Sequence, residues 1–122
     1  MIMYDHIGLR TDDLDASVRF YTATLAELGH VLCSRDETSA GLGPKDAPSL
    51  WLYAQSAANP AGIHLAFRAA DRAAVDAFYK AGLMAGGRDN GAPGLRLDYS
   101  ALYYAAFLLD PDGNNVEAVC LK

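Results

Sequence analysis

The sequence repeats itself, and this repeat constrains the fold more than any other feature. At an offset of 58 residues, segment 6–10 (HIGLR) aligns with segment 64–68 (HLAFR). The alignment then runs without a gap to Gly29 in the first copy and Gly87 in the second. A repeat at a fixed offset indicates that one structural unit is used more than once. We therefore predict that both halves of the chain have the same local structure.

The length of the chain fits one domain made of two such units. Its 122 residues are 52% hydrophobic and 20% charged, which is typical of a globular protein with a real core. We predict a single domain over residues 1–122, with modules 1–58 and 59–122.

Each module is expected to begin with a strand followed by a helix. Short apolar segments predict strands over 5–9 and 63–67. Asp12 or Asp13 can cap the first helix, and Asp71 can cap the second, because their side chains accept bonds from free N–H groups of the first turn.

Apolar residues three or four positions apart predict one buried face on each helix. These residues are Leu14, Val18, Tyr21, Leu25 and Leu28 in the first helix, and Val75, Phe78, Tyr79 and Leu83 in the second. Glycine is a frequent helix terminator. We therefore expect the helices to end at Gly29 and at Gly86-Gly87.

Three more strands are expected after each helix. The predicted strands are 30–33, 39–42 and 49–53 in the first module, and 95–99, 103–109 and 115–121 in the second. The glycine-containing segment 89–94 is expected to be a loop that covers the mouth of a cleft. The fold class is therefore α+β: two βαβββ modules related by a pseudo-twofold, forming a cupped mixed sheet with helices outside.

The charge balance narrows the range of partners. Ten Lys and Arg stand against fifteen Asp and Glu, and no basic cluster interrupts this balance, so nucleic acid and anionic membrane are not expected as partners. The chain shows neither an apolar run of roughly 18–20 residues nor a secretory signal pattern. Two cysteines are too few for a disulfide framework. We expect a cytoplasmic protein that handles small molecules or other proteins.

Two histidines and one glutamate are candidates for a metal site. His6 and His64 occupy equivalent positions, and a pseudo-twofold would bring the first strands of both modules together. Strand alternation places Glu117 on the face opposite Val116 and Ala118. Two imidazoles and a carboxylate suit Fe, Mn, Ni or Zn. The other interpretation is that the histidines are structural and the glutamate is a solvated strand residue.

The chain resembles the vicinal oxygen chelate superfamily, which includes glyoxalase I, bleomycin resistance proteins and extradiol dioxygenases. It is most similar to the short bacterial glyoxalase-like members. Segment 6–10 with the following Phe20-Tyr21 fits the family's first strand and helix, and segment 104–117 (YAAFLLDPDGNNVE) fits its last hairpin. The resemblance implies that the two histidines and Glu117 are metal ligands. It also implies a homodimer, either side by side or with exchanged halves.

One position departs from the glyoxalase I pattern. Those enzymes carry a fourth ligand, a Glu on the last strand of the first half. When 46–51 (DAPSLW) is aligned with 112–117 (DGNNVE), Trp51 stands where that Glu would be. The remaining three ligands resemble those of extradiol dioxygenases and fosfomycin-inactivating thiol transferases. We expect a metal-dependent lyase, isomerase, transferase or dioxygenase acting on a small-molecule substrate with vicinal oxygens.

Aromatic residues are the remaining site candidates. Tyr103 and Tyr104 begin a predicted strand, so one of them should face the cleft and assist Glu117 in catalysis. Trp51, Tyr53 and Tyr99 are candidates for the substrate pocket. Two other functions stay open: a metal-free small-molecule binding protein of the bleomycin-resistance type, and a scaffold or accessory domain.

Overall fold

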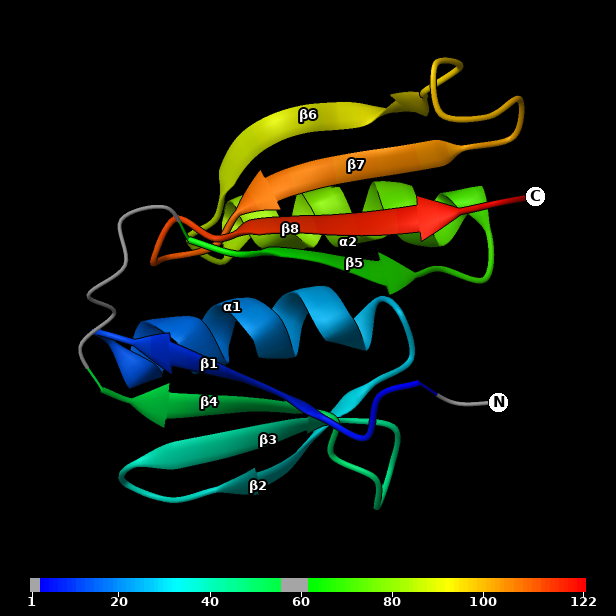
Figure 1. Cartoon of the computed structure of the whole chain (residues 1–122). Coiled ribbons are helices and arrows are strands. Elements are labelled where there is room, and N and C mark those ends of the chain that lie inside the picture. Colours follow the sequence, from blue (N-terminus) through cyan, green and yellow to red (C-terminus); the bar gives the residue numbers. More distant parts are fainter. Residues whose placement is uncertain (1–2, 56–61) are drawn as a thin grey trace.

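A computed structural model describes residues 3–55 and 62–122 of the chain (Figure 1). Its elements are β1 (Ile7–Thr11), α1 (Leu14–Ala26), β2 (Val31–Arg35), β3 (Ser39–Gly43), β4 (Leu50–Ala54), β5 (His64–Arg68), α2 (Arg72–Met84), β6 (Arg88–Leu95), β7 (Tyr104–Leu109) and β8 (Asn115–Cys120). We call β1 to β4 with α1 the first module, and β5 to β8 with α2 the second. The predicted boundary between residues 58 and 59 lies outside the described residues.

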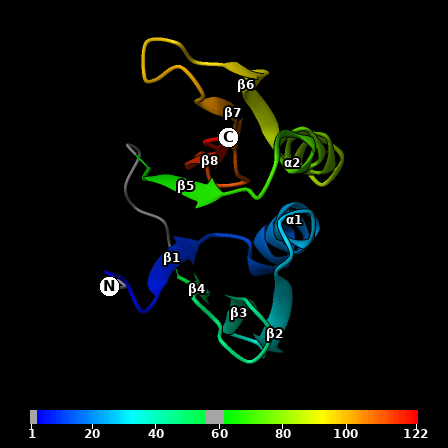
Figure 2. The ribbon, with the colours of Figure 1, turned by 90° about the vertical axis from the view of Figure 1, so that its right-hand side faces the viewer.

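Each module forms a four-stranded mixed sheet with the same topology. The strand orders are β1-β4-β3-β2 and β5-β8-β7-β6. In each sheet the first strand runs parallel to the last strand of its module, and the other pairs are antiparallel. The predicted α+β class and the two βαβββ modules are therefore confirmed. Among the described residues no ladder joins β1 to β5, so the chain contains two sheets, while α1 and α2 lie together (Figure 2).

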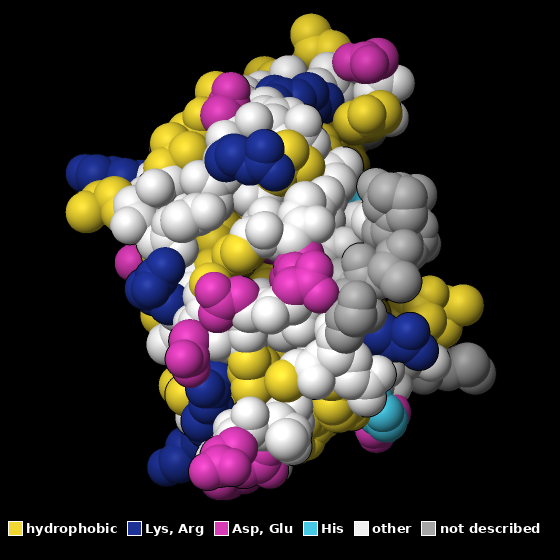
Figure 3. Space-filling view, turned by 90° about the vertical axis from the view of Figure 1, so that its left-hand side faces the viewer, with side chains coloured by type: hydrophobic (Ala, Val, Ile, Leu, Met, Phe, Trp, Pro, Cys, Tyr) yellow, Lys and Arg dark blue, Asp and Glu magenta, His cyan; other side chains and the backbone are white. Residues whose placement is uncertain are grey.

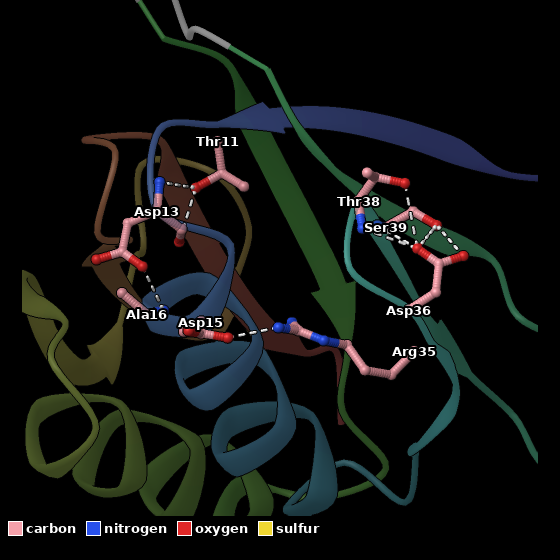
Figure 4. Close-up of polar contacts among 8 residues, drawn as sticks. All are labelled: Thr11, Asp13, Asp15, Ala16, Arg35, Asp36, Thr38 and Ser39. Carbon is pink, nitrogen blue, oxygen red and sulfur yellow. Dashed lines mark hydrogen bonds and ion pairs between the residues drawn. The ribbon is translucent and has the colours of Figure 1, made fainter.

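Both helices begin where the sequence predicts. The Asp13 carboxylate accepts the Ala16 N–H at 3.0 Å, so Asp13 is the cap of α1 (Figure 4). The Asp71 carboxylate accepts the Ala74 N–H at 2.8 Å and caps α2 in the same way. Gly29 follows α1 with a φ of 90°, a value that glycine adopts without strain.

Polar side chains fix the β2–β3 hairpin against α1. The Asp36 carboxylate accepts the backbone N–H groups of Thr38 and Ser39, both at 2.9 Å, and so closes the turn between the strands. Arg35 of β2 forms an ion pair with Asp15 in the first turn of α1 (Figure 4). These contacts hold the edge of the first sheet at the start of its helix.

Close packing around Gly82, within the second module and against α1, accompanies the one error in the predicted helix faces. Leu83 is 43% exposed, and Gly82 is buried instead. A Cβ atom at Gly82 would lie 2.2 Å from Leu108 of β7 and 3.0 Å from Thr24 of α1. The missing side chain therefore permits α2 to approach both β7 and α1. Leu14, Tyr21, Leu25, Val75 and Phe78 are buried as predicted.

Strand β6 corrects the predicted loop at 89–94. Residues 88–95 pair with β7, whereas 97–99, part of the predicted strand, form a turn. β6 is an edge strand that pairs with β7, and its register is irregular around Gly91. Pro93 therefore interrupts no hydrogen bonds to a second neighbouring strand. The segment is therefore part of the sheet and not a loop over a cleft.

A buried carboxylate joins the two modules. Asp110, at the end of β7, is 1% exposed and accepts the Tyr21 hydroxyl of α1 at 2.6 Å. Its other oxygen accepts two backbone N–H groups of its own turn, at 2.9 and 2.8 Å. The Ser17 hydroxyl of α1 donates to Asp112 at 3.2 Å. Burial and the Asp110 charge raise the pKa of Tyr21 well above its usual value. The 110–113 turn of one module is thus bonded to the helix of the other.

The outer surface carries mixed charge. On the face shown in Figure 3, Lys and Arg side chains are scattered among Asp and Glu and do not gather into one basic patch. In the part of the chain that the structure describes, no helix has the length and apolar character needed to cross a membrane.

The Tyr21–Asp110 bond yields a first prediction. Tyr21→Phe removes a buried donor from a charged acceptor, so the free energy of unfolding in urea should fall by about 2 kcal/mol. Tyr79→Phe is the matched control, because Tyr79 is the repeat equivalent of Tyr21 but its hydroxyl bonds to the exposed Asp89 at 2.9 Å. This control should be nearly neutral. Equal losses in the two variants would contradict the proposed role of the bond.

Candidate functional site

Three predicted site residues meet on one face of the second sheet. Val116 and Ala118 of β8 belong to the hydrophobic core, so strand alternation places Glu117 on the face turned away from α2. His64, the first residue of β5, and Tyr103, just before β7, contact Glu117 on this face. The sequence prediction that Glu117 faces away from the small apolar row is therefore confirmed.

The contacts of Glu117 involve both of its carboxylate oxygens. His64 Nε2 lies 3.1 Å from Glu117 Oε1, and the Tyr103 hydroxyl donates to Oε2. The Glu117 side chain is 2% exposed, whereas the His64 side chain is 50% exposed. A buried carboxylate is thus held between two partners, and the imidazole keeps an edge open to solvent.

The backbone determines which nitrogen of His64 carries a proton. His64 Nδ1 lies 3.1 Å from the carbonyl oxygen of Asn115, which can only accept, so Nδ1 is assigned as the donor. In the neutral ring Nε2 is then an acceptor, and it faces an oxygen of Glu117 that also accepts when ionised. Two facing acceptors at 3.1 Å need a proton or a metal cation between them.

Tyr103 is held as a proton donor. Burial, together with the hydrogen bond to Glu117 and the charge of that carboxylate, raises the pKa of Tyr103 to about 12. Its ring meets the Tyr99 ring edge-on, with centroids 5.0 Å apart. At neutral pH Tyr103 therefore remains a phenol that can donate a hydrogen bond and cannot act as a base.

An open hollow of about 610 Å³ lies over this group. It is lined by His64, Asp98, Tyr99, Tyr103, Phe107, Asn115 and Glu117. The Phe107 ring stacks on His64 with centroids 6.4 Å apart, and the Arg96 guanidinium lies 5.3 Å from the Phe107 centroid. The sequence analysis missed Phe107, Asp98 and Asn115. Alternation along β7 from Tyr103 would have placed Phe107 on the same face.

Three other predicted residues lie away from this hollow. The Tyr104 hydroxyl donates to Asp76 of α2 at 2.7 Å, so Tyr104 faces the helix. Trp51 and Tyr53 belong to β4 of the first sheet. Their rings lie so close to Gly41 and Gly8 that a Cβ at either glycine would approach them within 3 Å.

Strand register identifies Trp51 as the counterpart of Glu117. Gly8 of β1 pairs with Trp51, and Ala66 of β5 pairs with Glu117. Gly8 and Ala66 are equivalent in the repeat. The first sheet therefore carries an indole at the position where the second sheet carries its buried carboxylate.

His6 does not join His64 and Glu117 within the chain. Its Nδ1 lies 2.8 Å from the Asp5 carboxylate, and its side chain lines a separate pocket between the modules. Within residues 3–55 and 62–122, no cluster of three or more His, Cys, Asp or Glu side chains could hold a metal ion. The structure thus supplies two of the three expected ligands at one place.

Comparison with known proteins gives a family match over most of the chain. The model of the Glyoxalase/Bleomycin resistance protein/Dioxygenase superfamily matches residues 4–118. No curated protein matches the chain.

Solved structures agree with this match. A glyoxalase/bleomycin resistance protein from Albidiferax ferrireducens is 30% identical, covers 98% of both chains and superposes with a TM-score of 0.82. A glyoxalase/bleomycin resistance protein/dioxygenase family enzyme from Burkholderia phytofirmans, 21% identical, covers 97% of this chain and 98% of its own with a TM-score of 0.74. A glyoxalase-related enzyme from Fulvimarina pelagi, 18% identical, covers 98% and 88% with a TM-score of 0.75. The last two show likeness of fold alone.

Titration of Tyr103 tests the hydrogen bond at the centre of the site. Because its pKa is raised to about 12, the bond contributes stability below the usual tyrosine pKa of about 10, and this contribution is lost as pH rises towards 12. In a titration of phenolate absorbance, Tyr103→Phe should remove one transition with a midpoint of about 12. Loss of a transition near pH 10 would mean that Tyr103 is not bonded to Glu117.

Proposed function

The chain belongs to the Glyoxalase/Bleomycin resistance protein/Dioxygenase superfamily, and we propose that it is a divalent-metal-dependent enzyme acting on a small molecule with two adjacent oxygen atoms. His64 and Glu117 are two of the proposed metal ligands. The reaction is a lyase, isomerase, transferase or dioxygenase step. Without a fourth carboxylate at the position of Trp51, glyoxalase I activity is not proposed.

The observation that carries the proposal is the pair of facing acceptors. The Asn115 carbonyl directs one proton to Nδ1 of His64, so in the neutral ring the Nε2 lone pair lies 3.1 Å from Glu117 Oε1. A metal cation would take the place of the second proton that otherwise joins these two atoms. An imidazole nitrogen and a carboxylate oxygen are donors that suit Zn, Ni, Fe or Mn. The residues present therefore fit a cation of this class.

The surrounding residues orient the two ligands. The Asn115 carbonyl fixes the His64 ring from behind, and the Tyr103 hydroxyl holds Glu117 through Oε2, so that Oε1 stays directed at His64. A bound divalent cation would act as a Lewis acid toward two vicinal oxygens of the substrate. Tyr103 has a single hydroxyl proton, which is donated to Glu117, so the phenol could donate to a substrate oxygen that gains negative charge only in exchange for that bond. The Tyr99 and Phe107 rings border the open hollow.

We further propose that the third ligand, His6, comes from a second copy of the chain in a homodimer with exchanged halves. Within one chain His6 is bonded to Asp5 and is absent from the lining of the hollow. Apolar side chains next to the hollow are exposed, namely Leu97, Tyr99 and Leu102. Exposed apolar patches of this kind mark protein contacts. A second copy would cover them and bring a histidine to the hollow.

A metal-free binding protein of the bleomycin-resistance type is the second candidate. Two observations favour it: the described residues bring together only two metal-binding side chains, and Trp51 replaces a carboxylate. An indole and several phenols could hold an aromatic ligand without a metal. Metal binding separates the two candidates.

Calorimetric titration with Zn, Ni, Mn or Fe tests the first candidate. Glu117→Gln preserves the shape of the side chain but removes its charge. The affinity for metal should therefore fall by more than the roughly 10–100-fold loss that is typical when a residue hydrogen-bonded to a metal ligand is replaced. Tyr103→Phe should show that smaller loss. Glu37→Gln, which removes an exposed carboxylate, is the control and should bind as the parent protein does. If the parent protein binds none of these metals, the binding-protein candidate replaces the enzyme.

Mixing two inactive variants tests the exchanged dimer. His6→Ala and Glu117→Ala homodimers should both lack high-affinity metal sites. After joint refolding, a mixed dimer should regain one complete site, because each subunit supplies the ligand that the other lacks. His64→Ala mixed with Glu117→Ala is the control and should regain none, since both ligands belong to the same module. If the first mixture also regains none, His6 does not act from the second copy.

A further inference from the structure

The outer face of the first sheet, turned away from α1, carries two aromatic rings. Strand alternation places Trp51 and Tyr53 on this face, because the leucines of β4 belong to the hydrophobic core. Each ring leans over a glycine of a neighbouring strand: a Cβ atom would lie 2.8 Å from the Trp51 ring at Gly41 and 2.9 Å from the Tyr53 ring at Gly8. Both rings stay partly exposed. We call the surface formed by these four residues the aromatic face.

His6 and Trp51 are related in the first module as His64 and Glu117 are related in the second. In each module the residue two positions after the histidine pairs in register with the second member. His64 and Glu117 are in contact, with Nε2 and Oε1 3.1 Å apart. At about 3.3 Å per residue along a strand and about 4.8 Å between strands, the Cα atoms of His6 and Trp51 are roughly 8 Å apart. A contact that brings His6 to the His64–Glu117 hollow of a second copy therefore brings the Trp51 indole to the same hollow.

The charges of the aromatic face and of the hollow are complementary. None of the four strands of the first sheet contains Asp or Glu, and the exposed Arg10 of β1, as the register partner of Tyr53, lies on the aromatic side. The hollow contains the carboxylates of Asp98 and Glu117, and no Lys or Arg is found among the described residues that line it. The nearby Arg96 donates to two backbone carbonyls of β6. The two surfaces therefore favour association with each other.

We propose that the aromatic face of a second copy closes the hollow, and that the Trp51 indole of this copy stacks on a planar aromatic ligand held there. This arrangement rests on the exchanged homodimer proposed above and gives its site a ligand class. With about 610 Å³ the hollow has the volume of a small-molecule site, but such sites bury most of the ligand surface and this one is open. A second copy would supply the missing wall.

Aromatic rings then border the ligand on more than one side. Tyr99, Tyr103 and Phe107 line the hollow from the second module, and Trp51 faces them from the second copy. Ring pairs in offset-stacked or edge-on contact are favourable beyond the burial of their surface. The indole therefore selects ligands by their shape, whereas a carboxylate at the same position would be a further ligand for a cation. Trp51 is thus the residue that determines the specificity of the hollow.

Fluorescence quenching tests whether Trp51 is covered. Trp51 is the only tryptophan of the chain, so its emission is measured without interference from other indoles. Acrylamide should quench this emission several-fold less at concentrations at which sedimentation shows a dimer than after dilution to the monomer. The control is Trp51→Phe combined with Met84→Trp, because Met84 is 80% exposed on α2 and the indole placed there should be quenched equally in both states.

Benzyl alcohol and cyclohexylmethanol form a matched pair of probes that differ in whether the ring is planar and aromatic. In protein without added metal, calorimetry should show that the dimer binds benzyl alcohol about fivefold more tightly, the ratio that one favourable ring pair predicts. Trp51→Leu should bind both probes about equally, and Trp51→Phe, which keeps an aromatic ring, should retain the preference. Thermal unfolding should first establish that both variants fold.

A mixed dimer identifies the copy that supplies Trp51. In a dimer of Trp51→Leu with Tyr99→Ala, one of the two sites should keep both rings, so half of the sites should bind benzyl alcohol as the parent dimer does. If Trp51 acts within its own copy, no site keeps both rings and none binds in this way. The proposal is overturned by that result, by equal binding of the two probes to the parent dimer, or by a dimer in which acrylamide reaches Trp51 as readily as in the monomer. A chain that stays monomeric overturns the exchanged homodimer as well, whereas failure of metal binding changes none of these outcomes.

Discussion

The bond between Tyr21 and Asp110 is the constraint on which the arrangement of the modules depends. A carboxylate that is 1% exposed must be fully hydrogen-bonded, because an unpaired buried charge is far too costly. Within its own module Asp110 accepts two backbone N–H groups and, at 2.8 Å, the Asn114 side-chain amide, and α1 of the first module adds the Tyr21 hydroxyl. The correct docking of one module on the other therefore completes the hydrogen bonding of this charge. The inter-module cavity and the relative positions of His6 and His64 follow from that docking.

The two modules share the same backbone arrangement but carry different residues on their sheet faces. The registers of β1 with β4 and of β5 with β8 match residue for residue, yet one sheet presents Trp51 where the other presents Glu117. The tyrosines at equivalent helix positions differ in the same way, because Tyr21 is buried between the modules while Tyr79 bonds to the exposed Asp89. Shared backbone geometry thus leaves the chemistry of each sheet face free to change. In this protein the second module carries a polar site at this position, and the first module carries aromatic packing.

Local patterns predicted what depends on local geometry. Helix caps, the repeat and the outward direction of Glu117 follow from spacing along the chain, and the structure bears them out. The placement of His6 depends on how whole modules dock, which no local pattern encodes, and its role as a ligand stays a proposal. Strand β6 was missed because glycine and proline usually indicate loops, although an edge strand accepts them. Gly82 was not recognised as a contact residue, because glycine adds no apolar side chain to the sequence pattern. Its close contacts are evident only in the folded structure.

The absence of a side chain at Gly82 has a mechanical consequence. The backbone of α2 lies against side-chain methyl groups of Thr24 and Leu108 at this point, with no side chain of its own between them. Any residue larger than glycine at position 82 would have to displace these groups or push α2 away from α1 and β7. The width of the seam between the two helices is therefore set by the smallest side chain on either of them.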